Sequence, residues 1–165
     1  MRRKRAYGLP GMTAALAPPV KLATDQTWPL WEQSQRFELG HILNCAVSDA
    51  LRPAVIGALG IHHAGLWECD LNDNSLIWSG GSYDIFGLAR DVKVTREISL
   101  AHYAERSRAA LEALRTEAIR RKRGFTLDIE IRAAAVGDVR WVRVIGAPVC
   151  NGAQVVRLHG LKLII

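Results

Sequence analysis

The sequence predicts an α+β fold, in which helices flank an antiparallel sheet. Apolar residues recur at three- and four-residue steps over 29–51 and again over 103–123, which indicates amphipathic helices. Over 65–71 and 125–132 they alternate with polar residues, as in strands that are buried on one face. Turns rich in Gly, Asn and Asp separate neighbouring strands, so these strands run antiparallel. With 165 residues, about half of them apolar, the chain is the size of one compact domain with a short extension.

The N-terminal residues 1–27 mix basic residues, glycine and proline without apolar periodicity, which predicts a disordered basic arm. Residues 2–5 supply most of the formal net charge of +6, so the rest of the chain is nearly balanced. Three widely spaced cysteines favour neither a disulfide framework nor a zinc site. No apolar run nears the ~20 residues that cross a bilayer. We therefore expect a cytoplasmic protein without a membrane segment.

A flanking amphipathic helix is predicted over 28–53, after the arm. Its apolar positions form one stripe, which has to be buried: Trp31, Leu39, Ile42, Leu43, Ala46, Val47, Ala50 and Leu51. Pro53 interrupts the pattern. The apolar segment 54–61 fits a second short helix, although its two glycines weaken that prediction.

A β-hairpin is predicted next, from Gly65 to Trp78, with its turn at 72–75. Gly80 to Ser82 end the hairpin, and a single helical turn follows, which Gly87 terminates.

The strongest helix is predicted over 103–123, where the basic last turn complements the helix dipole. Three long strands follow, at 125–132, 139–149 and 154–165. The last two strands are apolar on both faces, so both faces of the sheet should be covered.

Six segments, in this order and at this spacing, resemble a PAS domain of the sensory-kinase type over residues 54–165. They are G-L-W-E-C-D-L (65–71), L-I-W-S (76–79), F-G-L (86–88), D-I-E-I-R (128–132), G-D-V-R-W-V-R-V-I-G-A-P-V (137–149) and V-R-L-H-G (156–160). The resemblance implies a five-stranded antiparallel sheet in the order 2-1-5-4-3, with helices on one face that enclose a small cavity. It implies no reaction. The stretch H-Y-A-E-R, at 102–106, departs from the His-Pro-Asp-Asp-Arg that is common in such domains. No kinase, cyclase or DNA-binding module follows, so we expect a stand-alone module that signals through a partner protein in trans.

Strand parity predicts a ligand pocket between the helix 103–123 and the inner side of the sheet. The odd-numbered residues of 125–131 face the core, and two valines of the next strand meet them across the hairpin. The inward or outward register of the last two strands stays open. The predicted pocket residues are His102, Leu111, Leu114, Ile129, Val142 and Val144.

The sequence specifies no cofactor and no metal site. Cys69 reads as a small buried hydrophobe, and the Asn-Cys-Arg-Phe-Leu motif of flavin photoreceptors in this family is absent, so covalent flavin is not expected. The sequence leaves open a role for His102 as a haem ligand, but one imidazole alone does not indicate haem. The adjacent His62 and His63 cannot converge on one metal. No nucleophile, base and orienting group can be assembled, so we expect no enzyme.

The outer face of the sheet is predicted to be covered by the helix 28–53 and by a second copy of the chain. If Val142 and Val144 point inward, their neighbours on the strand point outward. The residues of this predicted dimer face are Trp31, Leu39, Ile42, Leu43, Trp141 and Ile145. The basic tetrads at 2–5 and 120–123 lack interleaved aromatic residues, so nucleic acid is not an expected partner.

Three functional hypotheses remain. The leading one is a non-catalytic module for signal sensing or protein interaction, dimeric, which binds a small apolar or aromatic ligand. The second is a ligand-free dimerisation or docking subunit. The third, ranked well below, is a small enzyme of the ketosteroid-isomerase type, which requires an inward-facing acid on a strand. Asp128 and Glu130 fall on the polar side of their strand instead.

Overall fold

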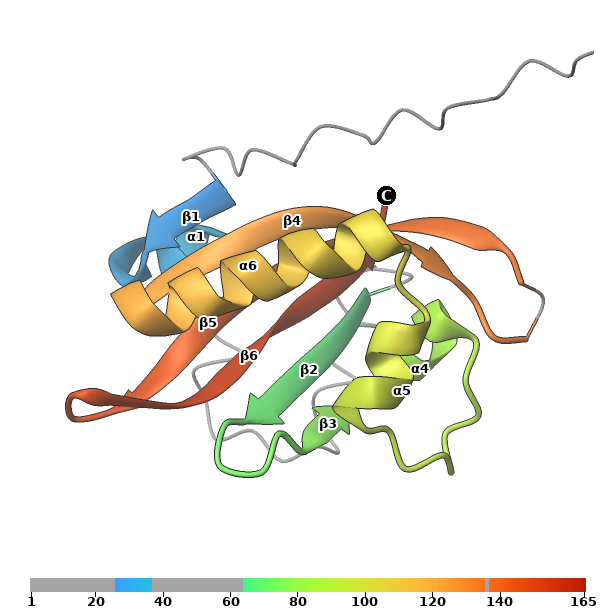
Figure 1. Cartoon of the computed structure of the whole chain (residues 1–165), viewed down its shortest axis with the longest axis horizontal. Coiled ribbons are helices and arrows are strands. Elements are labelled where there is room, and N and C mark those ends of the chain that lie inside the picture. The colour runs from blue at the N-terminus through green and yellow to red at the C-terminus, as the bar shows by residue number, and fades with distance from the viewer. Residues whose placement is uncertain (1–25, 37–63, 136) are drawn as a thin grey trace, which may run out of the picture.

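The computed structural model of the chain describes residues 26–36, 64–135 and 137–165. They form one six-stranded antiparallel sheet with helices on both sides (Figure 1). The strands are β1 (Thr27–Pro29), β2 (Ala64–Asp70), β3 (Leu76–Trp78), β4 (Arg123–Arg132), β5 (Val139–Asn151) and β6 (Gln154–Ile164). The helices are the 3-10 turn η2 (Leu30–Glu32), α1 (Gln33–Arg36), α4 (Gly80–Phe86), α5 (Arg96–Ala101) and α6 (Glu105–Arg121).

The strand order is β1-β4-β5-β6-β2-β3. The five strands from β2 to β6 therefore have the predicted order 2-1-5-4-3. The predicted number of strands was wrong, because β1 adds a sixth strand at the free edge of β4. Trp28 pairs with Gly124, whose missing side chain leaves room for the indole ring, and the Trp28 Nε1–H donates to Thr126 Oγ1 at 3.1 Å.

Strand parity is as predicted on the inner face. The odd-numbered residues from Phe125 to Ile131 are buried, and Val142 pairs with Ile129 while Val144 pairs with Leu127. These residues belong to the main core, into which α6 contributes Ala110, Leu114 and Ala118. The register of the last two strands is also resolved, since Val144 pairs with Lys162 on the same inner face.

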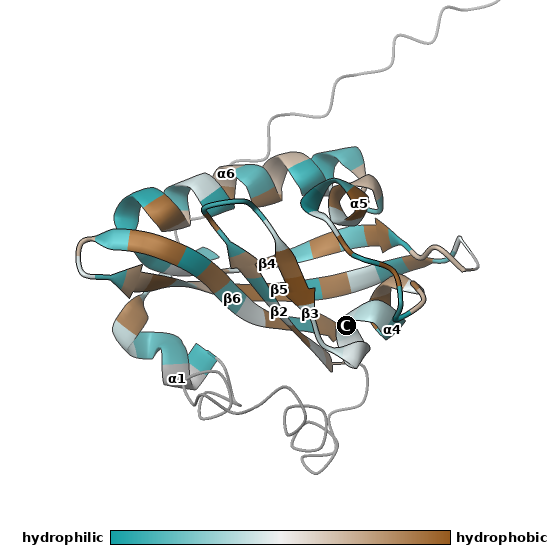
Figure 2. Ribbon diagram, turned by 90° about the horizontal axis from the view of Figure 1, so that it is seen from below, coloured by the Kyte–Doolittle hydropathy of each residue, from teal (hydrophilic) through white to brown (hydrophobic). Residues whose placement is uncertain are grey.

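The helices are arranged on the two sides of the sheet as Figure 2 shows, with α5 and α6 on one side and α1 on the other. Gly87 ends α4 at a positive φ of 65°, as the sequence indicated. The first residue of the helix is Gly80 rather than a residue after Ser82, whose hydroxyl is buried and donates to Leu66 O. None of the helices in the described ranges is long and apolar enough to span a membrane.

A second, smaller core lies on the outer face. It consists of Trp28, Ala64, Leu66, Ile145, Ala147 and Leu161, with Leu30 and Leu163 packed against it. Ile145 is thus covered, whereas Trp141 is 45% exposed and Trp31 is 75% exposed. Of the predicted helix 28–53, the structure describes only the part through Arg36, which forms β1, η2 and α1. The predicted face residues Leu39, Ile42 and Leu43, the arm up to residue 25 and the segment 54–63 lie outside the described residues.

The link between α5 and α6 runs along the edge of β4 beyond β1. The Ala104 N–H donates to Glu130 O at 2.9 Å, and the Arg132 N–H donates to His102 O at 2.8 Å. The Ser107 hydroxyl accepts from the Glu130 N–H at 2.9 Å. The N–H and C=O of Glu130 and the N–H of Arg132 are therefore satisfied from the same chain.

Candidate ligand-binding site

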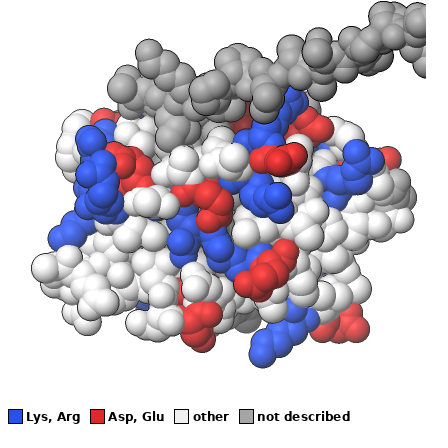
Figure 3. All heavy atoms as spheres, in the orientation of Figure 1, with Lys and Arg blue, Asp and Glu red and all other residues white. Residues whose placement is uncertain are grey.

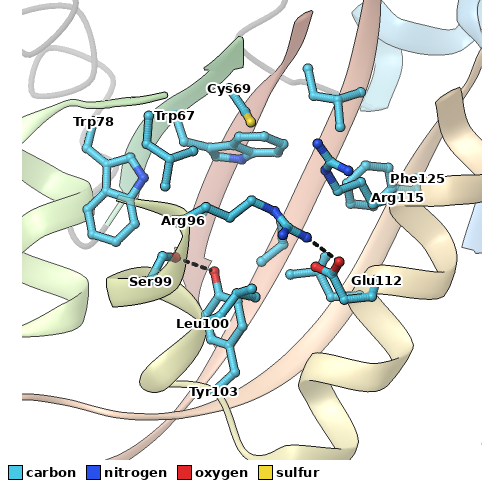
Figure 4. A pocket seen from close by; sticks show the side chains of 15 residues that line it. Trp67, Cys69, Trp78, Arg96, Ser99, Leu100, Tyr103, Glu112, Arg115 and Phe125 are labelled. Carbon is cyan, nitrogen blue, oxygen red and sulfur yellow. Dashed lines mark hydrogen bonds and ion pairs between the residues drawn. The ribbon is translucent and has the colours of Figure 1, made fainter. Parts of the chain in front are cut away.

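A half-open cavity lies between the inner face of the sheet and the helices α5 and α6 (Figure 4). Its free volume is about 60 Å³. A single water occupies about 10–15 Å³ on such a scale, so a molecule of only a few heavy atoms fits without movement of the walls. The lining residues come from eight segments: Trp67, Cys69, Leu76, Trp78, Arg96, Ser99, Leu100, Tyr103, Leu111, Glu112, Arg115, Phe125, Val144, Leu158 and Lys162.

The back of the cavity is aromatic. Trp67 and Trp78 are cross-strand partners on the inner face, and the Trp67 ring lies 6.5 Å from the Phe125 ring between centroids. Gly146 makes this packing feasible, because a side chain there would overlap Phe125 and crowd Trp67. The Trp67 Nε1–H donates to Leu161 O at 3.3 Å. The wall suits an apolar or aromatic ligand.

The mouth of the cavity is polar. Arg96 of α5 forms an ion pair with Glu112 of α6, and Figure 4 shows this pair reaching from one helix to the other. Arg115 donates to Asn74 Oδ1 at 2.9 Å from the next turn of α6. Both residues of the ion pair remain partly exposed, so it closes the mouth incompletely.

Two hydroxyls meet inside the cavity. Ser99 Oγ and Tyr103 Oη lie 3.0 Å apart. Burial raises the pKa of Tyr103 to about 12, so the phenol stays protonated and can donate a hydrogen bond at neutral pH.

Lys162 is the unexpected residue of the wall. It is only 3% exposed, and its Nζ lies 3.8 Å from the centroid of the Trp78 ring and 4.5 Å from that of the Phe86 ring. Burial lowers the pKa of the Lys162 amine well below its ordinary value. Two ring faces favour the ammonium by about 2 kcal/mol when desolvated. Removing an ammonium from water costs several kcal/mol, so burial prevails and favours the neutral amine.

Trp78 adds an unsatisfied polar group to the wall. Its Nε1–H is buried and has no hydrogen-bond partner among the described residues. In Figure 4 the ring nitrogen lies on the side of the indole that is nearest the cavity. A buried donor without an acceptor costs about 1–3 kcal/mol, which an acceptor on a bound molecule would recover.

The predicted pocket residues are distributed over the cavity and its surroundings. Leu111 and Val144 line the cavity. Leu114, Ile129 and Val142 are fully buried in the core around it. His102 does not belong to the lining, since its Nδ1 lies 2.9 Å from Arg132 O and its ring packs edge-on against Phe86.

Sequence reasoning missed Lys162, Arg96 and Glu112. A signal for Lys162 was present, because it follows Leu158 and Gly160 at two-residue steps on the inward side of β6. Arg96 and Glu112 belong to different helices, and no local pattern connects them.

The cavity in this shape is too small for a large cofactor. Pockets for drug-sized ligands measure about 300–1,000 Å³, several times the free volume here. A flavin or a haem therefore does not fit unless the walls move. Cys69 lies in the wall, and burial raises the pKa of its thiol, which favours an inert thiol over a reactive thiolate.

Two carboxylates of β4 outside the cavity are engaged in ion pairs. Asp128 accepts two hydrogen bonds from Arg143, at 2.7 and 2.9 Å, on the outer face. Glu130 is paired with Arg106. Within the described ranges no three His, Cys, Asp or Glu side chains come together as a metal site. The adjacent His62 and His63 lie outside the described ranges.

Basic and acidic side chains are interspersed on the face that α6 covers, as Figure 3 shows. In the basic tetrad at 120–123, Arg120 and Arg121 are both paired with Glu117, and Arg123 donates to Thr27 O at 3.1 Å.

No protein-family model matches the sequence. No curated protein matches it either. Solved structures do match. A sensory box histidine kinase/response regulator from Burkholderia thailandensis E264 matches with a TM-score of 0.57 and 19% identity, over 69% of this chain and 84% of that one. The PAS domain of the fruit-fly ELK potassium channel matches with a TM-score of 0.51 and 16% identity, over 68% and 95% of the two chains. An RNA-binding light-oxygen-voltage receptor matches with a TM-score of 0.55 and 18% identity over 61% of this chain. The match covers only 29% of the length of the receptor.

Proposed function

We propose that this chain, which has the fold of a PAS domain, is a non-catalytic sensor module whose cavity binds a small apolar or aromatic molecule. The observation that carries the proposal is the half-open cavity, whose aromatic wall contains the buried Trp78 Nε1–H, which has no hydrogen-bond partner among the described residues, and the buried Lys162 amine, which lies over two aromatic rings. A bound molecule that accepts a hydrogen bond from Trp78 would offset the cost of burying this donor.

A signal requires that binding favour one of two arrangements of the domain. The ion pair of Arg96 with Glu112 joins α5 and α6 at the mouth, so a molecule that enters would displace these helices relative to each other. We propose that a partner protein in trans reads this change.

The ligand-free alternative, a dimerisation or docking subunit, has one observation in its favour. The free volume of about 60 Å³ means that the chain's own side chains occupy most of the space between helices and sheet. Native mass spectrometry of the purified chain separates the two functions, because only the first predicts a co-purifying molecule or saturable binding.

Val144→Phe should abolish binding of a small aromatic probe. Val144 lines the cavity on β5, and a phenyl ring there would fill much of the free volume. Benzene, which has six heavy atoms, serves as the probe, with its proton NMR signal as the readout, and we expect affinity to fall at least tenfold.

The matched control is Val139→Phe, because Val139 lies on the same strand but is 53% exposed. Leu111→Phe, in the cavity wall on α6, repeats the test if Val144→Phe does not fold. Unchanged affinity in a folded Val144→Phe chain would show that the probe binds elsewhere, and no binding to the native chain would refute the ligand-binding function.

We also propose that the outer face pairs with a second copy of the chain. Trp31 and Trp141 are large and exposed, and Trp141 points to the outer side of β5 because its neighbour Val142 points inward. Aromatic side chains such as these are enriched in protein–protein interfaces.

Trp31→Glu should weaken self-association at least tenfold, because it places a charge in the proposed interface. Sedimentation velocity over a micromolar concentration series measures the change. Ala113→Glu, on the exposed side of α6, is the control and should leave association unchanged. A native chain that sediments as a monomer at high micromolar concentration would contradict the dimer.

A further inference from the structure

Lys162 faces several ionisable groups in the cavity, and none of them neutralises it. The wall contributes Cys69 from β2, Arg96 from α5, Tyr103 from the link to α6, and Glu112 and Arg115 from α6. The one carboxylate among them, that of Glu112, is paired with Arg96. Among the described residues, the contacts of the Lys162 Nζ are instead the faces of two aromatic rings.

We infer that the Lys162 amine captures small carbonyl compounds that enter the cavity and holds them as a reversible imine. The inference rests on the proposed ligand-binding function and names its chemical class. Ligands of this class are aldehydes or ketones of about four to six heavy atoms, which is what a cavity of this volume admits.

A carbonyl group offers a reaction partner to the Lys162 amine and an acceptor to the unsatisfied Trp78 N–H. The carbonyl carbon is the electrophile that a neutral amine attacks, and a buried amine is neutral more often than an exposed one. Until the C–O bond breaks, the carbonyl oxygen is an acceptor, which the Trp78 Nε1–H lacks among the described residues. A carboxylate ligand would add a buried charge to an aromatic wall, whereas a carbonyl adds none.

The chemistry balances without an external oxidant or reductant. The nitrogen lone pair of Lys162 forms a bond to the carbonyl carbon, and one amine proton moves to the oxygen to give a carbinolamine. The second amine proton joins the oxygen as the C–O bond breaks, and water leaves through the mouth beside Arg96 and Glu112. Added water reverses both steps, so capture follows the concentration of the carbonyl compound.

The test is reductive trapping of the full chain with propanal and cyanoborohydride, followed by peptide mass spectrometry. The exposed lysines Lys93 and Lys122 are internal references. At pH 7 an ordinary lysine is neutral in only about one molecule in 2,000. We therefore expect Lys162 to be labelled at least tenfold faster than Lys93 at pH 7, and this preference to disappear near pH 10.5, where exposed amines also become neutral.

Two variants and one competitor locate the reaction. Trp78→Phe keeps an aromatic face but removes the N–H donor, and should slow labelling of Lys162 several-fold. Val144→Phe should block the labelling of Lys162, and excess benzene should compete with it, while Lys93 is labelled as before in each case.

Labelling of Lys162 no faster than that of Lys93 at pH 7 would overturn the inference. Benzene distinguishes failure of the imine from failure of the proposed function, because it lacks a carbonyl group. If the chain binds benzene but is not labelled at Lys162, the proposed ligand-binding function stands and the imine is refuted. If the chain neither binds benzene nor is labelled, both are refuted.

Discussion

Trp28→Ala should lower the free energy of unfolding by about 3–5 kcal/mol, the usual cost of removing a large buried aromatic side chain. Trp28 is 1% exposed, packs in the outer core with Ile145 and Leu161, and donates a hydrogen bond to Thr126. Chemical denaturation followed by circular dichroism measures the change. A loss below about 1 kcal/mol would mean that β1 is a dispensable addition to the sheet.

Gly124 provides the matched test, because its missing side chain accommodates the Trp28 ring. Gly124→Ala should destabilise the native chain, since the new methyl group overlaps the indole. In the Trp28→Ala background the same change should be neutral or stabilising by about 0.5–1 kcal/mol, because Ala is favoured over Gly within a strand. This reversal of sign is a coupling between two contacting residues. If Gly124→Ala changed the free energy of unfolding equally in both backgrounds, Gly124 and Trp28 would not be coupled.

Lys162→Met should raise the free energy of unfolding at pH 7 by about 1–3 kcal/mol, the typical cost of a buried polar group without a partner. Methionine has a similar length and no charge to desolvate. Because the folded pKa of Lys162 lies below the unfolded value of about 10.4, the unfolded chain binds an additional proton between the two values. The stability of the native chain relative to Lys162→Met should therefore rise with pH in that window, by at most about 1.4 kcal/mol per pH unit.

The advantage of Lys162→Met should stop changing with pH above pH 10.4, where the amine is neutral in both states and only the cost of burying the neutral amine remains. Tyr103, whose folded pKa is about 12, and the other alkaline groups are present in both chains and cancel in the comparison. The control is Lys93→Met, because Lys93 is exposed and should change stability by less than about 0.5 kcal/mol. A Lys162→Met chain less stable than the native one would show that the two rings hold a charged ammonium.

The inner face of the sheet could be predicted because its signal is local. Alternation over 125–132 distinguishes Leu127 and Ile129 from Asp128 and Glu130, and the structure has this parity. The same rule applied to β5 placed Val142 and Val144 inward. Alternation within one strand indicates which of its residues face inward, and this inference needs no information from the rest of the chain.

The missed features depend on partners distant in the sequence. The three residues of β1 show no alternation and end in Pro29, and their pairing joins positions nearly 100 residues apart. Lys162 sits in a strand that is apolar on both faces, where a lysine suggests the solvent side, because charged residues are seldom buried. Only the observed pairing with Val144 places it in the cavity.

The covered edge of β4 limits how the sheet can associate. Exposed strand edges invite a further strand from another chain, and this route leads to aggregation as well as to peptide binding. Here β1 and the α5–α6 link occupy the β4 edge, and the new outermost strand is only three residues long and ends in Pro29, which has no N–H to donate. The opposite edge, β3, is equally short. Within the described residues, therefore, neither edge strand offers a long template for a foreign strand.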